Sequence, residues 1–456
     1  EALMAVTAGS SSAFGGVAGY SFASLTDCDN FASELDFLGM ALNAHFGGIV
    51  GYGCKPITNC NNNADISVRR DVSTLTNTSS ANGNIAGIVG YAQAGTVVSS
   101  CVNKGDIAVI DACHSIREGG VAGISYDEIK DCKNYGSINL VRKNVEYAVT
   151  PNSVLSSVGG VIGMHNIAVE VSNLENHGRV DVTLDSQAGT ANVAGVLARM
   201  AQATNIRNAK NTADITVDAG GSTPSHYVGG VGNSEAKGSG FYDCTNSGNI
   251  AYKNGFSTSF TYVGGVQGFY KNSAQVMERC VNTGNVTSDA QAKMRIGGLA
   301  AAMYGEIKDC SSSGDITVAN ATAGSRVGGA FGYASVNMTG GSFNHNITIG
   351  NTGGTSHAGL LFGDCARENT LAGLTVDGQI TSDDNVKAGI LIGGYNANTA
   401  KYTLGTTESP FIIKATAAVN GMAVSANPTV DADVVGDIVT NAPEGNAIIY
   451  ANVIVQ

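Results

Sequence analysis

Residues 129–140 read IKDCKNYGSINL, a pattern of apolar-x-x-Cys-x-Asn-x-Gly-x-Ile that returns as FYDCTNSGNIAY at 241–252, MERCVNTGNVTS at 277–288 and IKDCSSSGDITV at 307–318. A Gly-Gly-Val cluster or a close variant, such as GGIVGY at 47–52, precedes each cysteine position by 12 to 15 residues. The cluster recurs about every 34 residues, a period typical of solenoids and other stacked repeats. Its second glycine is Gly16, Gly48, Gly87, Gly120, Gly160, Gly195, Gly230, Gly265, Gly298, Gly329, Gly359 and Gly389.

Each repeat contains three short strand-like runs. They are the GGIVGY run, the run that ends at the cysteine position, and a DITV-like run after the glycine. Each run has period-two apolar spacing and ends at Gly, Asn or Ser, which favours strand over helix. We therefore predict an all-β fold, a right-handed parallel β-helix (β-solenoid) with about 12 to 13 coils of roughly 30 to 40 residues. The prediction is a single domain over 1–456, with clear coils over 15–395 and a degenerate terminal coil or cap over 396–456.

Stacking of coils places equivalent residues over one another, so two positions should form ladders. The cysteine slot is always apolar or a thiol, which predicts that it points into the core as free, unbridged thiols. It holds Cys28, Cys60, Cys101, Cys132, Leu174, Ala209, Cys244, Cys280, Cys310, Phe343 and Leu374. The position two residues later should form an amide ladder at a turn, where asparagine tolerates a left-handed backbone. It holds Asn30, Asn62, Asn103, Asn134, Asn176, Asn211, Asn246 and Asn282.

The remaining cysteines, Cys54, Cys113 and Cys365, are the only candidates for unusual pairings. The seven histidines form no His-x-His or His-x-x-x-His pair, which indicates scattered surface residues. We expect no metal and no cofactor.

Composition limits the classes of partner. The chain carries 37 acidic and 25 basic residues, a net charge of -12, which argues against nucleic acid and anionic membranes. No apolar run reaches 18 residues, so we expect no membrane-spanning segment. The chain opens at Glu1 without a hydrophobic leader, and we expect that any export signal has been removed. Neither end reads as a cap, which predicts a fragment of a longer protein or ends covered by partners, with lateral or end-to-end contacts.

At GGIVGY with ITNCNNNADI (57–66), and at AGIVGY (86–91) with SSCVNKGDI (99–107), the sequence resembles the GLUG-motif repeat family of bacterial surface and secreted proteins. The resemblance covers 15 to about 395, and the copies GVLARM (195–200) and GGAFGY (328–333) depart from the pattern. It implies an extracellular or cell-surface location and an adhesin-like role, and it brings no catalytic residues with it.

A parallel β-helix can also carry enzymes that cleave polysaccharides, which need clustered acids on successive coils. Asp65, Asp106 and Asp315 share one position, but other residue types fill it in several coils, and Asp383 with Asp384 lies in a turn. The sequence has no nucleophile elbow and no phosphate-binding or dinucleotide-binding motif. We expect that the protein is not an enzyme.

Two surfaces are candidates for binding. The longest inserts, 69–84 and 141–157, with Phe31 to Phe46 in the first coil, gather at one edge, where solenoids display recognition loops. Alternation along GGIVGY predicts an outward aromatic slot, Tyr20, Tyr52 and Tyr91, which could stack on sugar rings. The same slot holds Phe269, Tyr333 and Tyr395 in later coils.

By the same count, the position before that slot also points outward, although it is apolar, so this face should be covered by loops or another chain. It holds Val50, Val89, Ile162, Leu197, Phe331, Leu361 and Leu391. The leading hypothesis is a non-catalytic extracellular scaffold that binds a glycan or a host or cell-surface protein. A polysaccharide lyase or hydrolase and a purely structural stalk are the alternatives.

Overall fold

The structure is a computed structural model. It describes residues 2–6, 12–39, 43–69, 82–111, 115–142, 155–186, 188–222, 224–269, 275–365, 369–396, 402–428, 434–439 and 448–456. Within these ranges there is no helix, hence none able to cross a membrane, and parallel strands form a β-solenoid of about 11 turns. The predicted fold class is therefore confirmed. The chain divides into two compact units, unit 1 (1–236 with 253–255) and unit 2 (237–252 with 256–456), which are described separately.

A typical coil of unit 1 contains five short strands. The three predicted runs are present. Two more strands, which the sequence pattern did not reveal, precede the Gly-Gly corner and follow the cysteine slot. The strands before the Gly-Gly corner are β2 (Ser12–Gly15), β7 (Asn43–Gly47), β12 (Asn82–Ala86), β17 (Ser115–Gly119), β22 (Leu155–Gly159), β27 (Thr190–Ala194) and β32 (Tyr227–Gly229). Those after the corner are β3 (Ala18–Ser21), β8 (Val50–Gly53), β13 (Val89–Ala92), β18 (Ala122–Ser125), β23 (Ile162–His165), β28 (Leu197–Met200) and β33 (Gly232–Ser234). Those before the cysteine slot are β4 (Leu25–Thr26), β9 (Ile57–Thr58), β14 (Val98–Ser99), β19 (Ile129–Lys130), β24 (Val171–Ser172) and β29 (Asn205–Arg207). Those after the cysteine slot are β5 (Asp29–Asn30), β10 (Asn61–Asn62), β15 (Val102–Asn103), β20 (Lys133–Asn134), β25 (Glu175–Asn176) and β30 (Lys210–Asn211). The last strands of the coils are β1 (Ala2–Val6), β6 (Glu34–Gly39), β11 (Asp65–Arg69), β16 (Ile107–Asp111), β21 (Ile138–Arg142), β26 (Val180–Thr183) and β31 (Ile215–Asp218).

The strands pair in parallel and in register, so each core residue stacks on its equivalent in the next coil. Val68 of β11, for example, pairs with Phe37 of β6 on one side and Val109 of β16 on the other, and all three side chains are buried. Because neighbouring coils lie about 4.8 Å apart, such columns bury apolar side chains continuously. This stacking gives each unit one continuous hydrophobic core that runs along the solenoid.

The GGIVGY run turns a corner instead of forming one strand. Strand β7 ends at Gly47 and β8 begins at Val50, and a side chain on Gly47 would overlap the carbonyl oxygen of Val50. The turn restarts the alternation, so Ile49 and Val50 both point inward with no exposed surface. The prediction that the apolar residues at the Val50 position face outward and need a cover was therefore wrong. Val50, Val89, Ile162, Leu197 and Phe331 are buried in the core. Leu361 and Leu391 were assigned to this position wrongly, because Phe362 and Ile392 are the residues in register with Phe331, although both leucines are buried too.

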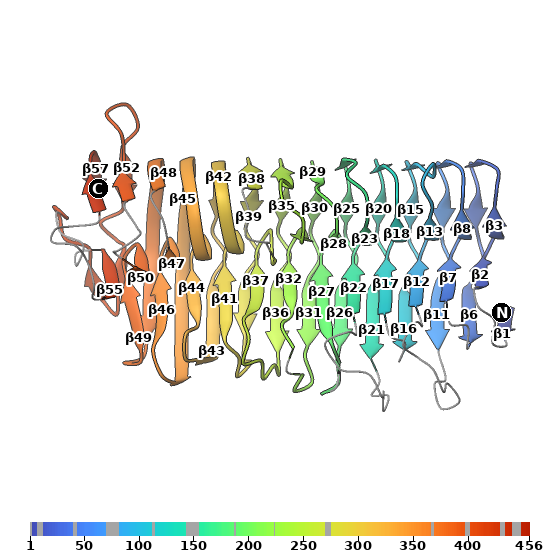
Figure 1. The fold of residues 1–456 in the computed structure, drawn as a ribbon, viewed down its shortest axis with the longest axis horizontal. Helices are drawn as coiled ribbons and strands as arrows, with labels where there is room; N and C mark the ends of the chain where they lie inside the picture. The colour runs from blue at the N-terminus through green and yellow to red at the C-terminus, as the bar shows by residue number, and fades with distance from the viewer. Residues whose placement is uncertain are drawn as a thin grey trace. The chain divides into compact units, whose positions relative to one another are not determined.

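Unit 2 uses the same coil with longer strands, because several short strands merge into continuous ones (Figure 1). β45, for instance, runs for 23 residues. In chain order the strands are β34 (Gly240–Tyr242), β35 (Thr245–Asn246), β36 (Ile250–Lys253), β37 (Thr261–Gly264), β38 (Gln275–Glu278), β39 (Val281–Asn282), β40 (Val286–Ser288), β41 (Met294–Gly297), β42 (Ala300–Ser312), β43 (Ile316–Thr322), β44 (Arg326–Gly328), β45 (Phe331–Gly353), β46 (Ser356–Gly359), β47 (Phe362–Cys365), β48 (Asn369–Ser382), β49 (Val386–Gly389), β50 (Ile392–Asn396), β51 (Tyr402–Leu404), β52 (Phe411–Ile413), β53 (Ala418–Val419), β54 (Met422–Ala423), β55 (Val435–Val439), β56 (Ile448–Tyr450) and β57 (Val453–Val455).

Candidate functional site

The asparagine slot forms an amide ladder inside the solenoid. In unit 1, Asn62 Nδ2 donates to Asn103 Oδ1 and Asn103 Nδ2 donates to Asn134 Oδ1, both at 2.8 Å. The same pattern continues to Asn176 and Asn211, and in unit 2 Asn246 Nδ2 donates to Asn282 Oδ1 at 2.8 Å. Because these side chains are buried and bonded to one another, the ladder stabilises the fold and offers no polar group to a ligand.

The Gly-Gly corner and the asparagine ladder pack against each other across the coil. A side chain on Gly48 would overlap Asn62, and one on Gly87 would overlap Asn103. Asn30 Nδ2 also donates to the carbonyl oxygen of Gly48 at 3.0 Å. The two sequence landmarks are therefore one contact, since the glycine leaves the space that the asparagine fills.

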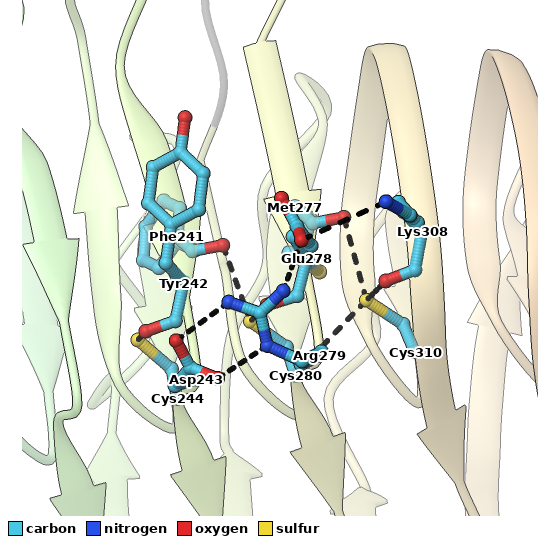
Figure 2. A network of polar contacts seen from close by, with 10 residues as sticks. All are labelled: Phe241, Tyr242, Asp243, Cys244, Met277, Glu278, Arg279, Cys280, Lys308 and Cys310. Carbon is cyan, nitrogen blue, oxygen red and sulfur yellow. Dashed lines mark hydrogen bonds and ion pairs between the residues drawn. The ribbon is translucent and has the colours of Figure 1, made fainter.

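The left-handed backbone was assigned to the wrong position. The ladder asparagines have ordinary φ angles, whereas the residue just before the cysteine slot has φ between 50° and 55° in nine coils. These residues are Asp27, Asn59, Ser100, Asp131, Asn173, Asn208, Asp243, Arg279 and Asp309. Here the chain turns outward, and short polar side chains tolerate the strain best. Arg279 is the exception, and it is held by a two-point ion pair to Asp243 at 2.6 and 2.9 Å and by Glu278 (Figure 2).

The cysteine slot lies inward, as predicted, and the described cysteines are all free thiols. Each thiol also donates a weak hydrogen bond to the carbonyl oxygen two residues earlier, as Cys280 does to Glu278 and Cys310 to Lys308 at 3.5 and 3.3 Å (Figure 2). Hydrogen bonds between neighbouring thiols and burial raise the pKa of Cys28, Cys60 and Cys280, and a hydrogen bond with Cys132 is the main cause that raises the pKa of Cys101 to about 12. The reactive thiolate is therefore suppressed at these four thiols.

One residue assigned to the cysteine slot lies outside it. Cys310 is in register with Gly341 and then Leu374, so Leu374 is in the slot, whereas Phe343 lies two residues farther along its strand. The Gly340–Gly341 pair turns this coil in place of the usual residues. Off the ladder, Cys54 and Cys365 are unpaired thiols, and Cys113 lies outside the described residues.

The candidate acids support the backbone. Asp65 Oδ1 accepts the amide of Asp106 at 2.8 Å, and Asp106 Oδ1 accepts the amide of Ser137 at 2.7 Å. Asp315 accepts from Asn346, and Asp383 accepts the amide of Asn351 at 2.7 Å. Asp65, Asp106 and Asp383 therefore hold backbone amides of a neighbouring coil, and Asp315 holds a side-chain amide.

The prediction of surface histidines was wrong for four of the six described. His165 lies 2.7 Å from Ser125 Oγ, and His345 lies 2.7 Å from Ser312 Oγ, in hydrogen-bonded sites inside the solenoid. Burial lowers the pKa of both, and that of His226, to about 4. The buried set is His45, His165, His226 and His345, and His114 lies outside the described residues. No grouping of three or more His, Cys, Asp or Glu side chains suited to a metal occurs in the described ranges.

The tyrosines of the predicted aromatic slot in unit 1 form a column, and a fourth ring extends it. Tyr20, Tyr52 and Tyr91 are register partners, and the rings of Tyr52 and Tyr91 stack at 4.7 Å and 4°. Tyr126 extends the column 5.4 Å from Tyr91. Because the middle rings cover each other's faces, Tyr20 at the end, 46% exposed, has the ring face available for stacking. Tyr395 is out of this slot, since Gly394 is the residue in register.

A groove of about 360 Å³ opens beside this column in unit 1. It forms where outward residues from the two sides of the Gly-Gly corner meet, and His45 lies 5.5 Å from Tyr52 and 5.0 Å from Tyr91 between ring centres. The groove is lined by Asn43, His45, Tyr52, Asn82, Asn84, Tyr91, Arg117, Ile124 and Tyr126.

Polar groups in the groove are ordered by contacts between coils. Asn82 Nδ2 donates to Asn43 Oδ1 at 2.9 Å, and Asn84 Nδ2 lies 2.9 Å from His45 Nδ1. Arg117 Nη1 donates to Asn84 Oδ1 at 3.3 Å. Burial raises the pKa of Tyr52 and Tyr91, and the hydroxyl of Tyr52 donates to Gln93 Oε1 at 2.9 Å. The result is a preformed row of amide, guanidinium and phenol groups.

Sequence reasoning identified the lining residues Tyr52 and Tyr91 through the aromatic slot, and its predicted inserts 31–46 and 69–84 contain Asn43, His45, Asn82 and Asn84. It missed Arg117, Ile124 and Tyr126. His45, Asn84 and Arg117 occupy one position, three residues before the second glycine, on a strand that was not predicted. Carrying the alternation backward from the glycines would have found them. Most of the predicted recognition loops, 69–84 and 141–157, lies outside the described residues.

No protein-family model, curated protein or solved structure matches the chain.

Proposed function

We propose that the protein is a non-catalytic extracellular or cell-surface scaffold that binds a glycan in the groove of unit 1. The observation that carries the proposal is the groove lining, which combines amides, a guanidinium and phenols and includes no carboxylic acid. Amide side chains both donate and accept hydrogen bonds, as sugar hydroxyls do. The resemblance to surface-protein repeats supports the location.

The arrangement of the rings defines how a sugar would bind. Because Tyr52 and Tyr91 stack on each other, their facing ring surfaces are covered, and a glycan would be held mainly by hydrogen bonds to the amides and Arg117. Tyr20 supplies a stacking surface at the end of the column.

The lining also bears on the enzyme alternative. Glycoside hydrolysis normally uses two carboxyl groups that flank the bond, roughly 5 to 9.5 Å apart. None of the nine lining residues can act in this way. The candidate acids Asp65 and Asp106 are hydrogen-bonded to backbone amides instead.

A glycan array followed by calorimetry on the best neutral ligand tests the proposal. The double variant Asn82→Ala/Arg117→Gln should weaken binding at least tenfold, or about 1.4 kcal/mol, and Tyr20→Ala should weaken it about threefold. Tyr135→Ala is the matched control, since Tyr135 is 48% exposed and stacks on His177 at 4.9 Å outside the groove. Absence of any bound glycan, or equal affinity of the groove variants and the wild type, would favour a structural stalk.

A further inference from the structure

Unit 2 carries a ladder of basic residues at one outward position. Arg295 of β41, Arg326 of β44, His357 of β46 and Lys387 of β49 are register partners in four successive coils. Parallel pairing places such residues about 4.8 Å apart along the solenoid. This concentration of basic groups stands out in a chain with a net charge of -12.

Aromatic rings hold the two guanidinium groups in place. Arg295 lies over the rings of Phe260 and Tyr333, with its Cζ 4.2 and 4.5 Å from the ring centres. Arg326 lies over Tyr333 at 4.9 Å. Stacked in this way, the guanidiniums lose little rotational freedom when they bind an anion.

The acidic groups do not balance the ladder. Asp364 forms an ion pair with Arg326 at 2.9 Å and lies 3.9 Å from His357. Within the described part of the chain, Arg295 and Lys387 have no ion pair, and the polar partner of Arg295 is the hydroxyl of Tyr262 at 3.5 Å. One carboxylate thus faces three permanent positive charges and a histidine. Because Arg295 and Arg326 are half-buried, water screens their charges less than it would at the open surface.

We propose that this ladder, Arg295, Arg326, His357 and Lys387, binds an acidic polysaccharide of the polyuronate class. A polyuronate carries one carboxylate on every sugar, and those that face the row of basic residues, about 4.8 Å apart along the coils, can form charge-assisted hydrogen bonds with it. The net charge of -12 disfavours the phosphate backbone of a nucleic acid. The site uses different residues from the groove of unit 1 and does not depend on the function proposed for that groove.

The test compares an oligogalacturonate of defined length with its fully methyl-esterified form, which keeps the sugars and removes the charges. Calorimetry on the full chain should show at least 30-fold tighter binding of the acid form. Arg326→Gln/Lys387→Gln should weaken that binding at least tenfold. Lys387→Gln alone, at an exposed position where the fold is unaffected, should weaken it about threefold. Lys308→Gln is the matched control, because Lys308 is an exposed lysine of unit 2 outside the ladder, and it should change nothing.

Three results would overturn the proposal. The first is equal binding of the acid and ester forms, and the second is wild-type affinity in the folded Lys387→Gln variant. The third is equally tight binding of single-stranded oligothymidylate with the same loss in the ladder variants, which would indicate a general polyanion patch. The groove variant Asn82→Ala/Arg117→Gln should leave oligogalacturonate binding within twofold. A larger loss would move the acid site to the groove and count against the ladder.

Discussion

The outer side of the Gly-Gly corner is built from equivalent positions in both units, yet the two corners have different chemistry. In unit 1, His45, Asn84 and Arg117 stand beside the tyrosine column and leave an open groove. In unit 2, Arg295 and Arg326 lie over aromatic rings instead.

The inward positions change far less. Apolar residues, thiols and amides recur there because each must match the coils above and below it, whereas an outward residue is not held between packed core residues on every side and can vary. The comparison teaches that stacking determines the interior of each coil, and that differences in binding between the two units must lie in the outward positions.

The largest effect should come from the corner glycines, which the two units share. A valine at Gly87 would overlap Asn103 and the backbone of Gly120, and one at Gly265 would overlap Asn282 and the backbone of Gly298. Each substitution should lower the free energy of unfolding by about 4 kcal/mol or more. Urea denaturation measures this, with Gly353→Ala as the control, since nothing lies within 4 Å of a side chain there. A mild effect in only one unit would mean that the two corners are not equivalent.

Acid should destabilise both units through buried histidines. His165 in unit 1 and His345 in unit 2 have a pKa of about 4 when folded, below the usual value of 6.5. Between these values the unfolded chain binds protons that the folded chain excludes. Stability is therefore complete above about pH 6.5 and falls toward pH 4, by about 1.4 kcal/mol per pH unit for each histidine.

Urea denaturation at pH 7.5, 6 and 5 measures this slope. His165→Gln and His345→Gln should each remove the contribution of one proton from this slope, about 1.4 kcal/mol per pH unit. His177→Gln, at a half-buried surface site, is the control. An unchanged slope in both buried-site variants would contradict the assignment.

A smaller difference in stability should appear between the ladder position in unit 1, which holds Asn103, and the equivalent position in unit 2, which holds Ser312. Asn103→Ala removes bonds to Asn62, Asn134 and Gly105 in a fully buried site and should cost about 2 to 3 kcal/mol. At the equivalent position of unit 2, the hydroxyl of Ser312 bonds Gly329 and His345 among the described residues, so Ser312→Ala should cost about 1 kcal/mol. Thermal and urea denaturation give both values, with the exposed Asn346→Ala as reference. Equal costs would show that the asparagine ladder has no special cooperativity.

The repeat determined the fold without any structure. The period, the apolar or thiol occupant before each ladder asparagine, and the strand-like runs predicted parallel coils, because stacking forces equivalent residues into columns. The errors of the sequence-based prediction concerned local backbone turns. The run at Ile49 and Val50 was taken as one strand, although its glycines turn a corner, and that single turn reversed the predicted side of the second residue.

The sequence alone thus determined which residues are repeated and that they stack, since these depend only on the spacing along the chain. The tertiary structure decided where each coil bends and which outward residues meet across a bend, as His45 meets Tyr91. The angle between two short strands depends on close contacts, such as those of Gly48 with the Asn62 side chain and with the carbonyl oxygen of Gly87 in the next coil, and the repeat pattern does not specify it. For this reason the groove and the basic ladder became visible only in three dimensions.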